Sequence, residues 1–213
     1  MLYKETVETT TLELLASLQQ EEILKDFFLV GGTALSLQIG HRISIDLDLF
    51  TQKPFETENV LNVLEKKYNY HLDFQSKNSL KGEIGGVKVD LIADQYPLCQ
   101  DLIIINNIRM ATLLEISAMK LNAIMVNGTR LKDFIDIAFL SGFLSLNDMI
   151  NAYEIKYQTR NTITIIKSVS YFSDINYNEP IKLVATNFEW FLIETRLRQI
   201  VANPNQVFDK KII

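Results

Sequence analysis

The chain has 213 residues, of which 47% are hydrophobic and 22% charged, and its formal net charge at pH 7 is −5. This length allows one large domain or two small ones, and no stretch approaches the ~18 uncharged apolar residues of a membrane span. The single cysteine, Cys99, excludes an intrachain disulfide and a cysteine cluster around zinc, and two histidines are too few to complete a structural zinc site.

Hydrophobic periodicity predicts alternating helices and strands up to residue 50. The expected elements are a helix over 7–26, a strand over 27–30, a tight turn at Gly31-Gly32, a brief helix from Thr33 that closes at Gly40, and a strand over 44–50. In this last strand, Asp46 and Asp48 face one way, whereas Ile45, Leu47 and Leu49 face the other way, toward a core.

Residues 54–94 continue the alternation. After Pro54 we expect an amphipathic helix over 56–68, a strand over 70–77, and two strands within 80–94 that fold back at a Gly85-Gly86 hairpin turn. The alternation in the stretch VKVDLIA puts Asp90 on the same face as Lys88 and Ile92. Asp90 is therefore a third carboxylate carried by a strand.

From about Arg109 the pattern becomes helical. The expected helices cover 110–128, 131–142, 145–157, 160–172 and about 182–203, with Ser145 as an N-cap and Gly128 and Gly142 as stop signals. The predicted fold class is α+β, with a mixed sheet flanked by helices over residues 1–105 and an all-α half over residues 106–213.

The charge differs between these halves. Residues 1–108 hold 9 Lys+Arg and 16 Asp+Glu, a net charge of −7, whereas residues 109–213 hold 12 and 10, a net charge of +2. An acidic first half suits divalent metal binding, and neither half is basic enough to predict nucleic-acid binding by charge alone. Because the first ten residues lack the apolar core of a signal peptide, we expect a cytoplasmic protein with no membrane partner.

The paired aspartates predict a metal site. Two carboxylates at i and i+2 of a strand stand on one face about 7 Å apart at Cα, and they repel each other unless a cation lies between them. Mg²⁺ prefers such oxygen ligands and commonly binds substrate phosphates as well. With Asp90 as the third ligand, Asp46 and Asp48 would form a site for two Mg²⁺ ions that aligns an attacking oxygen with a phosphorus atom.

The glycine pair supplies a candidate phosphate site. Gly31 and Gly32 let a phosphate approach the backbone, and the amides at the start of the following helix attract an anion. The hydroxyl of Thr33 is a further phosphate ligand in this interpretation, and Arg42, between the two motifs, is a candidate of the same kind.

This ordered set resembles the DNA polymerase β superfamily of nucleotidyltransferases. The segments VGGTAL and HRISIDLDLF are similar to the AbiEii-type family, the toxins of type IV toxin–antitoxin and abortive-infection systems. The segments ISAMKLNAI and TRLKDFIDIAFL resemble that family's helical motifs, a lysine followed by a Lys-Asp-x-x-Asp helix. The resemblance covers residues 27 to 140 and implies a nucleotidyltransferase fold for the N-terminal half, whereas residues 145–213 carry no matching motif.

The resemblance also implies roles for residues. The glycines and Thr33 would hold the nucleoside triphosphate, although the family commonly has serine at the position of Thr33. Lys120 would contact the triphosphate or stabilise developing negative charge, and Asp133 and Asp136 would orient Lys120 or activate the acceptor hydroxyl. Each role has a structural alternative: open-face carboxylates can be solvated, Lys120 can extend to the surface, and the helical aspartates can pair with Arg130 and Lys132.

The expected activity is Mg²⁺-dependent transfer of a nucleoside monophosphate from a nucleoside triphosphate to an acceptor hydroxyl, with release of pyrophosphate. The resemblance implies a toxin, with tRNA or a protein as acceptor and a separately encoded antitoxin as partner. Two alternatives remain from the sequence: a small-molecule transferase of the antibiotic-modifying kind, and a catalytically silent binding module with the same fold.

Overall fold

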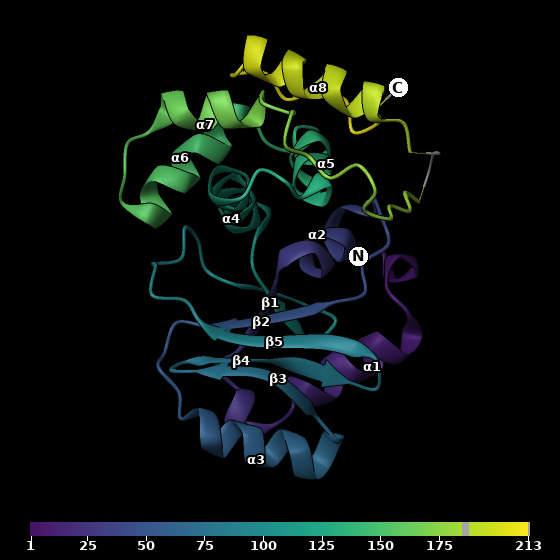
Figure 1. The fold of residues 1–213 in the computed structure, drawn as a ribbon, viewed down its shortest axis with the longest axis vertical. Helices are drawn as coiled ribbons and strands as arrows, with labels where there is room; N and C mark the ends of the chain where they lie inside the picture. The colour runs from purple at the N-terminus through teal and green to yellow at the C-terminus, as the bar shows by residue number, and fades with distance from the viewer. Residues whose placement is uncertain (185–187, 213) are drawn as a thin grey trace. The chain divides into compact units, whose positions relative to one another are not determined.

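The computed structural model describes residues 1–184 and 188–212 (Figure 1). These residues form two compact units: Met1–Pro97 with Asp101–Ala111, and Leu98–Gln100 with Thr112–Ile213. The first unit combines a sheet with helices, and the second is built from helices. The predicted α+β fold class is therefore confirmed.

A seven-stranded mixed sheet organises the N-terminal unit. Its strands are β1 (Phe28–Val30), β2 (Leu47–Thr51), β3 (His71–Ser76), β4 (Ser79–Ile84), β5 (Val87–Ala93), β6 (Ile103–Ile105) and β7 (Ile108–Met110), in the order β3-β4-β5-β2-β1-β7-β6. β2 is parallel to β5 and β1 is parallel to β7, whereas all other neighbours are antiparallel.

Three α-helices belong to the same unit: α1 (Thr9–Leu18), α2 (Gly31–Ile39) and α3 (Thr57–Tyr68). α1 is shorter than the predicted helix over 7–26, because the chain leaves it at Gln19 and forms a separate 3-10 turn at Glu22–Leu24. The side-chain amide of Gln19 donates to the carbonyl of Arg109 and accepts from its amide, each at 2.8 Å. This pairing to a distant backbone ends the helix where apolar spacing alone would continue it.

The strand that carries the paired aspartates is also shorter than predicted. β2 begins at Leu47, so Ser44, Ile45 and Asp46 precede it, and Ile45 is 55% exposed and does not belong to the core. The physical reason lies in tertiary hydrogen bonding, since the amide of Ser44 donates to the carbonyl of Thr6 at 2.9 Å and does not join the sheet ladder. Leu47 and Leu49 are buried, as expected.

Two hairpins shape the edges of the sheet. The predicted Gly85-Gly86 turn is confirmed, with φ of +56° and +84° at the two glycines. The hairpin of β6 and β7 is not part of the sequence-based prediction; it turns at Asn106 and Asn107, both with positive φ. α3 covers one face of β3 and β4 (Figure 1).

The helical unit contains α4 (Leu113–Val126), α5 (Leu131–Leu140), α6 (Leu146–Tyr157), α7 (Thr162–Val169) and α8 (Trp190–Ala202). Ser145 caps α6 through a capping box with Asp148, which confirms the predicted N-cap. The helix predicted over about 182–203 begins at Trp190, and residues 185–187 of that prediction lie outside the described residues. Within the described chain, no helix is long and apolar enough to cross a membrane.

Candidate active site

The candidate phosphate site is the first turn of α2, which begins at Gly31 directly after β1. Gly31 has a φ of +70°, and a Cβ there would collide with the Asp48 carboxylate. A Cβ on Gly32 would collide with the Arg42 guanidinium. Both glycines therefore allow charged side chains to approach the backbone of this turn closely. They are part of the helix, whereas the sequence analysis placed them in a turn before it.

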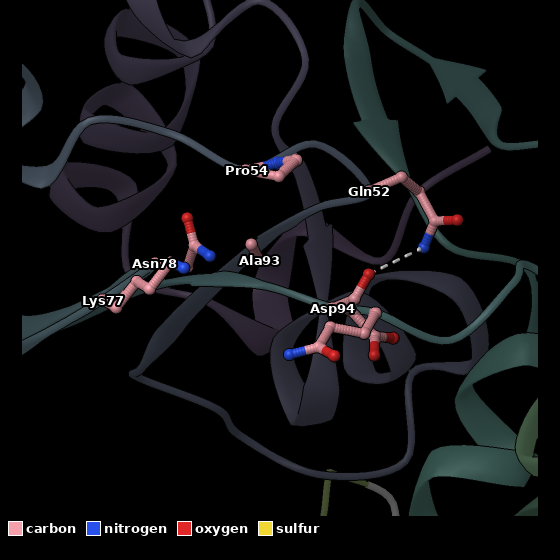
Figure 2. A pocket seen from close by; sticks show the side chains of 7 residues that line it. Gln52, Pro54, Lys77, Asn78, Ala93 and Asp94 are labelled. Carbon is pink, nitrogen blue, oxygen red and sulfur yellow. Dashed lines mark hydrogen bonds between the residues drawn. The ribbon is translucent and has the colours of Figure 1, made fainter.

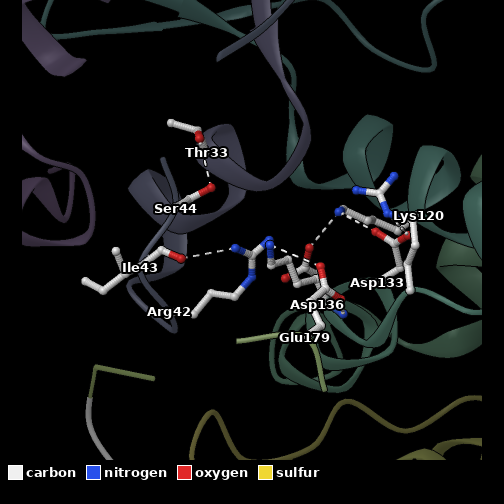
Figure 3. A network of polar contacts seen from close by, with 10 residues as sticks. Thr33, Arg42, Ile43, Ser44, Lys120, Asp133, Asp136 and Glu179 are labelled. Carbon is white, nitrogen blue, oxygen red and sulfur yellow. Dashed lines mark hydrogen bonds and ion pairs between the residues drawn. The ribbon is translucent and has the colours of Figure 1, made fainter. Parts of the chain in front are cut away.

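Thr33 fixes the segment that carries the first aspartate. Its buried hydroxyl donates to the carbonyl oxygen of Asp46 and shares a hydrogen bond of 2.9 Å with the hydroxyl of Ser44 (Figure 3). The sequence analysis expected this hydroxyl to contact phosphate. The structure instead gives it partners in the protein, so its observed role is to hold the backbone before β2.

Asp48 and Asp90 lie side by side on the sheet. They are register partners on the parallel strands β2 and β5, so their side chains leave the same face. Burial raises the pKa of the Asp90 carboxyl, the charge of Asp46 raises it further, and Lys81 opposes this shift. The Lys81 ammonium lies 3.5 Å from Asp90 Oδ2. Asp90 is thus in register with Asp48 and feels the charge of Asp46.

No metal-binding cluster is formed by the side chains as they stand. Among residues 1–184 and 188–212, no group of three or more His, Cys, Asp or Glu could hold a metal ion. The site at Asp46, Asp48 and Asp90 therefore stays a prediction. The donor chemistry fits the prediction, because the carboxylates are oxygen ligands whose mutual repulsion a divalent cation would relieve.

The three predicted residues of the helical unit meet in a buried ion-pair cluster. Lys120 Nζ on α4 lies 2.7 Å from Asp133 Oδ1 and 2.7 Å from Asp136 Oδ2, both on α5 (Figure 3). The side chains of Lys120, Asp133 and Asp136 are 9%, 1% and 0% exposed. Asp133 Oδ2 lies 3.6 Å from Arg130 Nε. The expected proximity of these residues across the two helices is therefore observed.

A second buried ion pair was not predicted. Lys156 Nζ lies 2.7 Å from Glu115 Oε1, and Glu115 Oε2 accepts a 2.7 Å hydrogen bond from the amide of Cys99. The spacing of Thr112 and Glu115 is that of a capping box, and Thr112 does cap α4, but the Glu115 side chain serves the ion pair. This cluster attaches residues 98–100 to the helical unit and has a structural role.

A hollow of the sheet unit lies elsewhere. A cavity of about 570 Å³ opens beyond the ends of β2 and β5 (Figure 2). It is lined by Gln52, Pro54, Lys77, Asn78, Ala93, Asp94 and Gln95. Gln52 donates to the carbonyl of Tyr96 at 2.8 Å, so one polar wall residue already has a protein partner. None of the predicted site residues lines this cavity.

Lys81 is the site residue that the sequence analysis missed. A signal was present, because the Gly85-Gly86 turn pairs Ile84 with Val87 and thereby sets Lys81 opposite Asp90. Counting outward from a hairpin turn would have identified the lysine beside the third carboxylate.

Comparisons with known proteins find relatives of this chain in sequence and in fold. Residues 13–88 match a family model described as "Nucleotidyl transferase AbiEii toxin, Type IV TA system". An uncharacterised protein of Aquifex aeolicus (strain VF5) is 35% identical over 159 residues, which cover 71% of this chain and 76% of the relative.

Two crystal structures from Helicobacter pylori, one of them described as a candidate nucleotidyltransferase, share the fold. Both align with a TM-score of 0.58 and 17% identity over 93% of this chain, and over 96% and 93% of their own chains. At this level of identity, the likeness establishes the fold alone.

Proposed function

We propose that this chain, which belongs to the AbiEii nucleotidyl transferase toxin family, transfers a nucleoside monophosphate from a nucleoside triphosphate to an acceptor hydroxyl and releases pyrophosphate. The observation that carries the proposal is the register of Asp48 with Asp90, next to the glycine turn that opens α2. Carboxylates for a metal and amides for a phosphate are what phosphoryl transfer requires of a protein.

We assign the metal to Asp46, Asp48 and Asp90. Mg²⁺ bound there would neutralise charge on the phosphates and align the attacking oxygen with the phosphorus. In this proposal the chain's own contribution is to supply three carboxylates to one metal site against their repulsion. Thr33 contributes by fixing the backbone of Asp46. The parallel pairing of β2 with β5 fixes the positions of Asp48 and Asp90.

We assign triphosphate binding to the first turn of α2. Its amides point along the helix axis, and the partial positive charge of a helix N-terminus favours an anion. The Arg42 guanidinium lies against Gly32 and adds a full positive charge at the same turn. An arginine can bind phosphate oxygens through two parallel hydrogen bonds.

For Lys120 we propose a role in stabilising negative charge on the reacting phosphates. Its ammonium is held between Asp133 and Asp136, so its position is fixed by the helical unit. The aspartates act as positioning residues in this proposal. We further propose that the acceptor is a nucleic acid or a protein, and that the activity is that of a toxin restrained by a separate antitoxin, as the family name implies.

The test is a transfer assay. The wild-type protein is incubated with each radiolabelled nucleoside triphosphate, Mg²⁺, and total cellular RNA and protein, and the labelled product is identified. The variant Asp46→Asn should fold normally but lose transfer, whereas Asp73→Asn, which removes an exposed carboxylate from β3, should keep it. Transfer by Asp46→Asn at the wild-type rate would contradict the metal assignment, and a wild-type protein that labels no acceptor would contradict the function.

A further inference from the structure

A row of register partners crosses one face of the sheet. The row consists of Val30 on β1, Asp48 on β2, Asp90 on β5, Lys81 on β4 and Phe74 on β3. Side chains of paired residues on neighbouring strands leave the same face. Two carboxylates, an ammonium and a phenyl ring therefore follow one another, and Gly31, which follows Val30, puts the phosphate-binding turn at the opposite end of the row from Phe74.

A β-bulge turns Phe74 onto this face. Leu72 pairs with Gly82, but Phe74 pairs with Lys81, so the strand gains one residue at Asp73. Without the bulge, the pairing of Leu72 would continue with Phe74 opposite Leu80, which is fully buried. The bulge leaves Phe74 52% exposed instead.

The residue that lies opposite Leu80, where Phe74 would lie without the bulge, is polar. Gln75 pairs with Leu80, and its side-chain amide donates to Thr57 at 3.0 Å and to Glu58 at 2.8 Å, both in α3. The strand thus turns a glutamine toward α3 and a phenylalanine toward the face of the carboxylates. Bulges beside active sites commonly redirect a side chain in this way.

Lys81 is available for a ligand on the same face. Its ammonium is 3.5 Å from Asp90 Oδ2, and its side chain is 47% exposed. A long, exposed ion pair of this kind is weak. A divalent cation on Asp90 would repel the ammonium, which could then bind a phosphate beside the carboxylates.

The order of the residues along the row determines which substrate lies beside Lys81 and Phe74. In an in-line displacement, the attacking oxygen and the leaving group lie on opposite sides of the transferred phosphorus. The leaving pyrophosphate belongs to the α2 turn, so the acceptor comes from the side of Lys81 and Phe74. Phe74 is two strands from Asp90, roughly 10 Å at the usual strand spacing.

We propose that Lys81 and Phe74 form a subsite for the terminal nucleotide of a single-stranded nucleic-acid acceptor, with a phosphate on Lys81 and a base stacked on Phe74. This inference rests on the proposed function and specifies its acceptor. Aromatic side chains on a sheet stack unpaired bases, and a neighbouring cation binds the backbone phosphate. A protein acceptor needs neither group, and a polycationic small molecule would be repelled by Lys81.

The test measures binding without transfer. A fluorescein-labelled RNA hexamer that ends in a 3′-deoxynucleotide is titrated with the full-length protein and Mg²⁺, and fluorescence anisotropy is recorded. Phe74→Ala should weaken binding by roughly 5- to 160-fold, the range expected for one lost stacked base, whereas Phe74→Trp should retain it. Lys81→Met should reduce the slope of log affinity against log salt by about 0.7, the value for one phosphate contact on a single strand.

Two matched variants serve as controls. Ile104→Ala removes an exposed apolar side chain from β6, the opposite edge of the sheet, and Lys77→Met removes a charge from the turn between β3 and β4. Both should bind the hexamer within about twofold of wild type. Nucleoside triphosphate affinity should be unchanged in Phe74→Ala, Phe74→Trp and both control variants, because the triphosphate lies at the other end of the row.

The outcomes separate this inference from the proposed function. The subsite is overturned if the wild-type protein transfers nucleotides but does not bind the hexamer. It is also overturned if Phe74→Ala and Lys81→Met both bind the hexamer as tightly as the wild-type protein. An active enzyme that labels only protein overturns the choice of nucleic acid. Absence of any transfer by the wild-type protein instead refutes the proposed function.

Discussion

Replacement of Lys120 with methionine should strongly destabilise the helical unit. The Lys120 ammonium lies 2.7 Å from carboxylate oxygens of both Asp133 and Asp136, and all three side chains are at most 9% exposed. Methionine keeps much of the volume of the lysine stem but removes the cation. Two carboxylates of like charge then remain buried next to each other.

The expected loss follows from this burial. Removal of one partner from a buried ion pair costs about 3–5 kcal/mol, because a charge remains without compensation. The two contacts of Lys120 do not add, since they share one ammonium. Arg130, whose Nε is 3.6 Å from Asp133 and whose side chain is 56% exposed, can turn toward Asp133 and reduce the loss. We therefore expect about 3 kcal/mol, the lower end of the range.

The assay is urea unfolding of the full chain followed by fluorescence of Trp190, the single tryptophan, which lies in α8 and contacts Phe172 and Tyr177. Lys132→Met is the matched control, because this lysine of α5 pairs with Glu179 at 3.1 Å but is 28% exposed. Its loss should be below about 1 kcal/mol.

A compensated variant completes the experiment. Lys120→Met combined with Asp133→Asn and Asp136→Asn also removes the two like charges that repel each other once the ammonium is gone, and it should recover part of the lost stability. Where circular dichroism shows that this variant is folded, its transfer rate reports the role of the Lys120 cluster in the reaction apart from its role in folding. A loss below about 1 kcal/mol for Lys120→Met alone would refute the argument from burial.

Three further predictions concern the site and the thiol. Thr33→Val should reduce transfer at least about tenfold with normal circular dichroism, because the backbone of Asp46 loses its hydrogen bond, whereas Thr33→Ser should remain active. Equal transfer rates for Thr33→Val and Thr33→Ser would contradict the anchoring role. Gly32→Val should weaken nucleoside triphosphate binding in equilibrium dialysis, because the new side chain collides with Arg42, and unchanged affinity would place the phosphate elsewhere. Burial raises the pKa of the Cys99 thiol from 9.0 to about 12, so iodoacetamide at pH 8 should react about a thousandfold more slowly than in urea, and similar rates would contradict this shift.

Local signals predicted most of the secondary structure correctly. The glycine hairpin at Gly85-Gly86, the left-handed cap at Gly40 and the capping box at Ser145 all depend on residues within one turn of the chain. Such features are specified by backbone sterics and short-range hydrogen bonds, so the sequence is sufficient to predict them.

Elements that depend on distant partners were missed or misplaced. β7 exists because it pairs in parallel with β1, with Met110 opposite Leu29, and the local sequence contains only a short apolar run. The early end of α1 and the late start of β2 have the same origin, since hydrogen bonds from Gln19 to Arg109 and from Ser44 to Thr6 replace local ones. Periodicity contains no information about these partners.

The candidate site shows the same division. Asp48 and Asp90 were identifiable from alternation within each strand, and Asp46 from its spacing to Asp48, although Asp46 precedes β2. The sequence could not show that β5 lies next to β2 or that Asp90 is in register with Asp48. Lys81 was predictable from the hairpin turn. Phe74 was not, because its face depends on a bulge that the alternation of β3 does not reveal.

The two faces of β4, β5 and β2 separate folding from function. One face buries Leu80, Leu91 and Leu49, and substitutions there should reduce the free energy of unfolding through lost apolar contacts. The other face holds Asp90 beside Asp48, and burial there raises the pKa of the Asp90 carboxyl, so the charged form of Asp90 is kept at a cost to stability that Lys81 only opposes. Residues kept in an arrangement that folding does not favour indicate a ligand, and the row from the carboxylates to Phe74 extends this argument beyond the metal ligands to the acceptor.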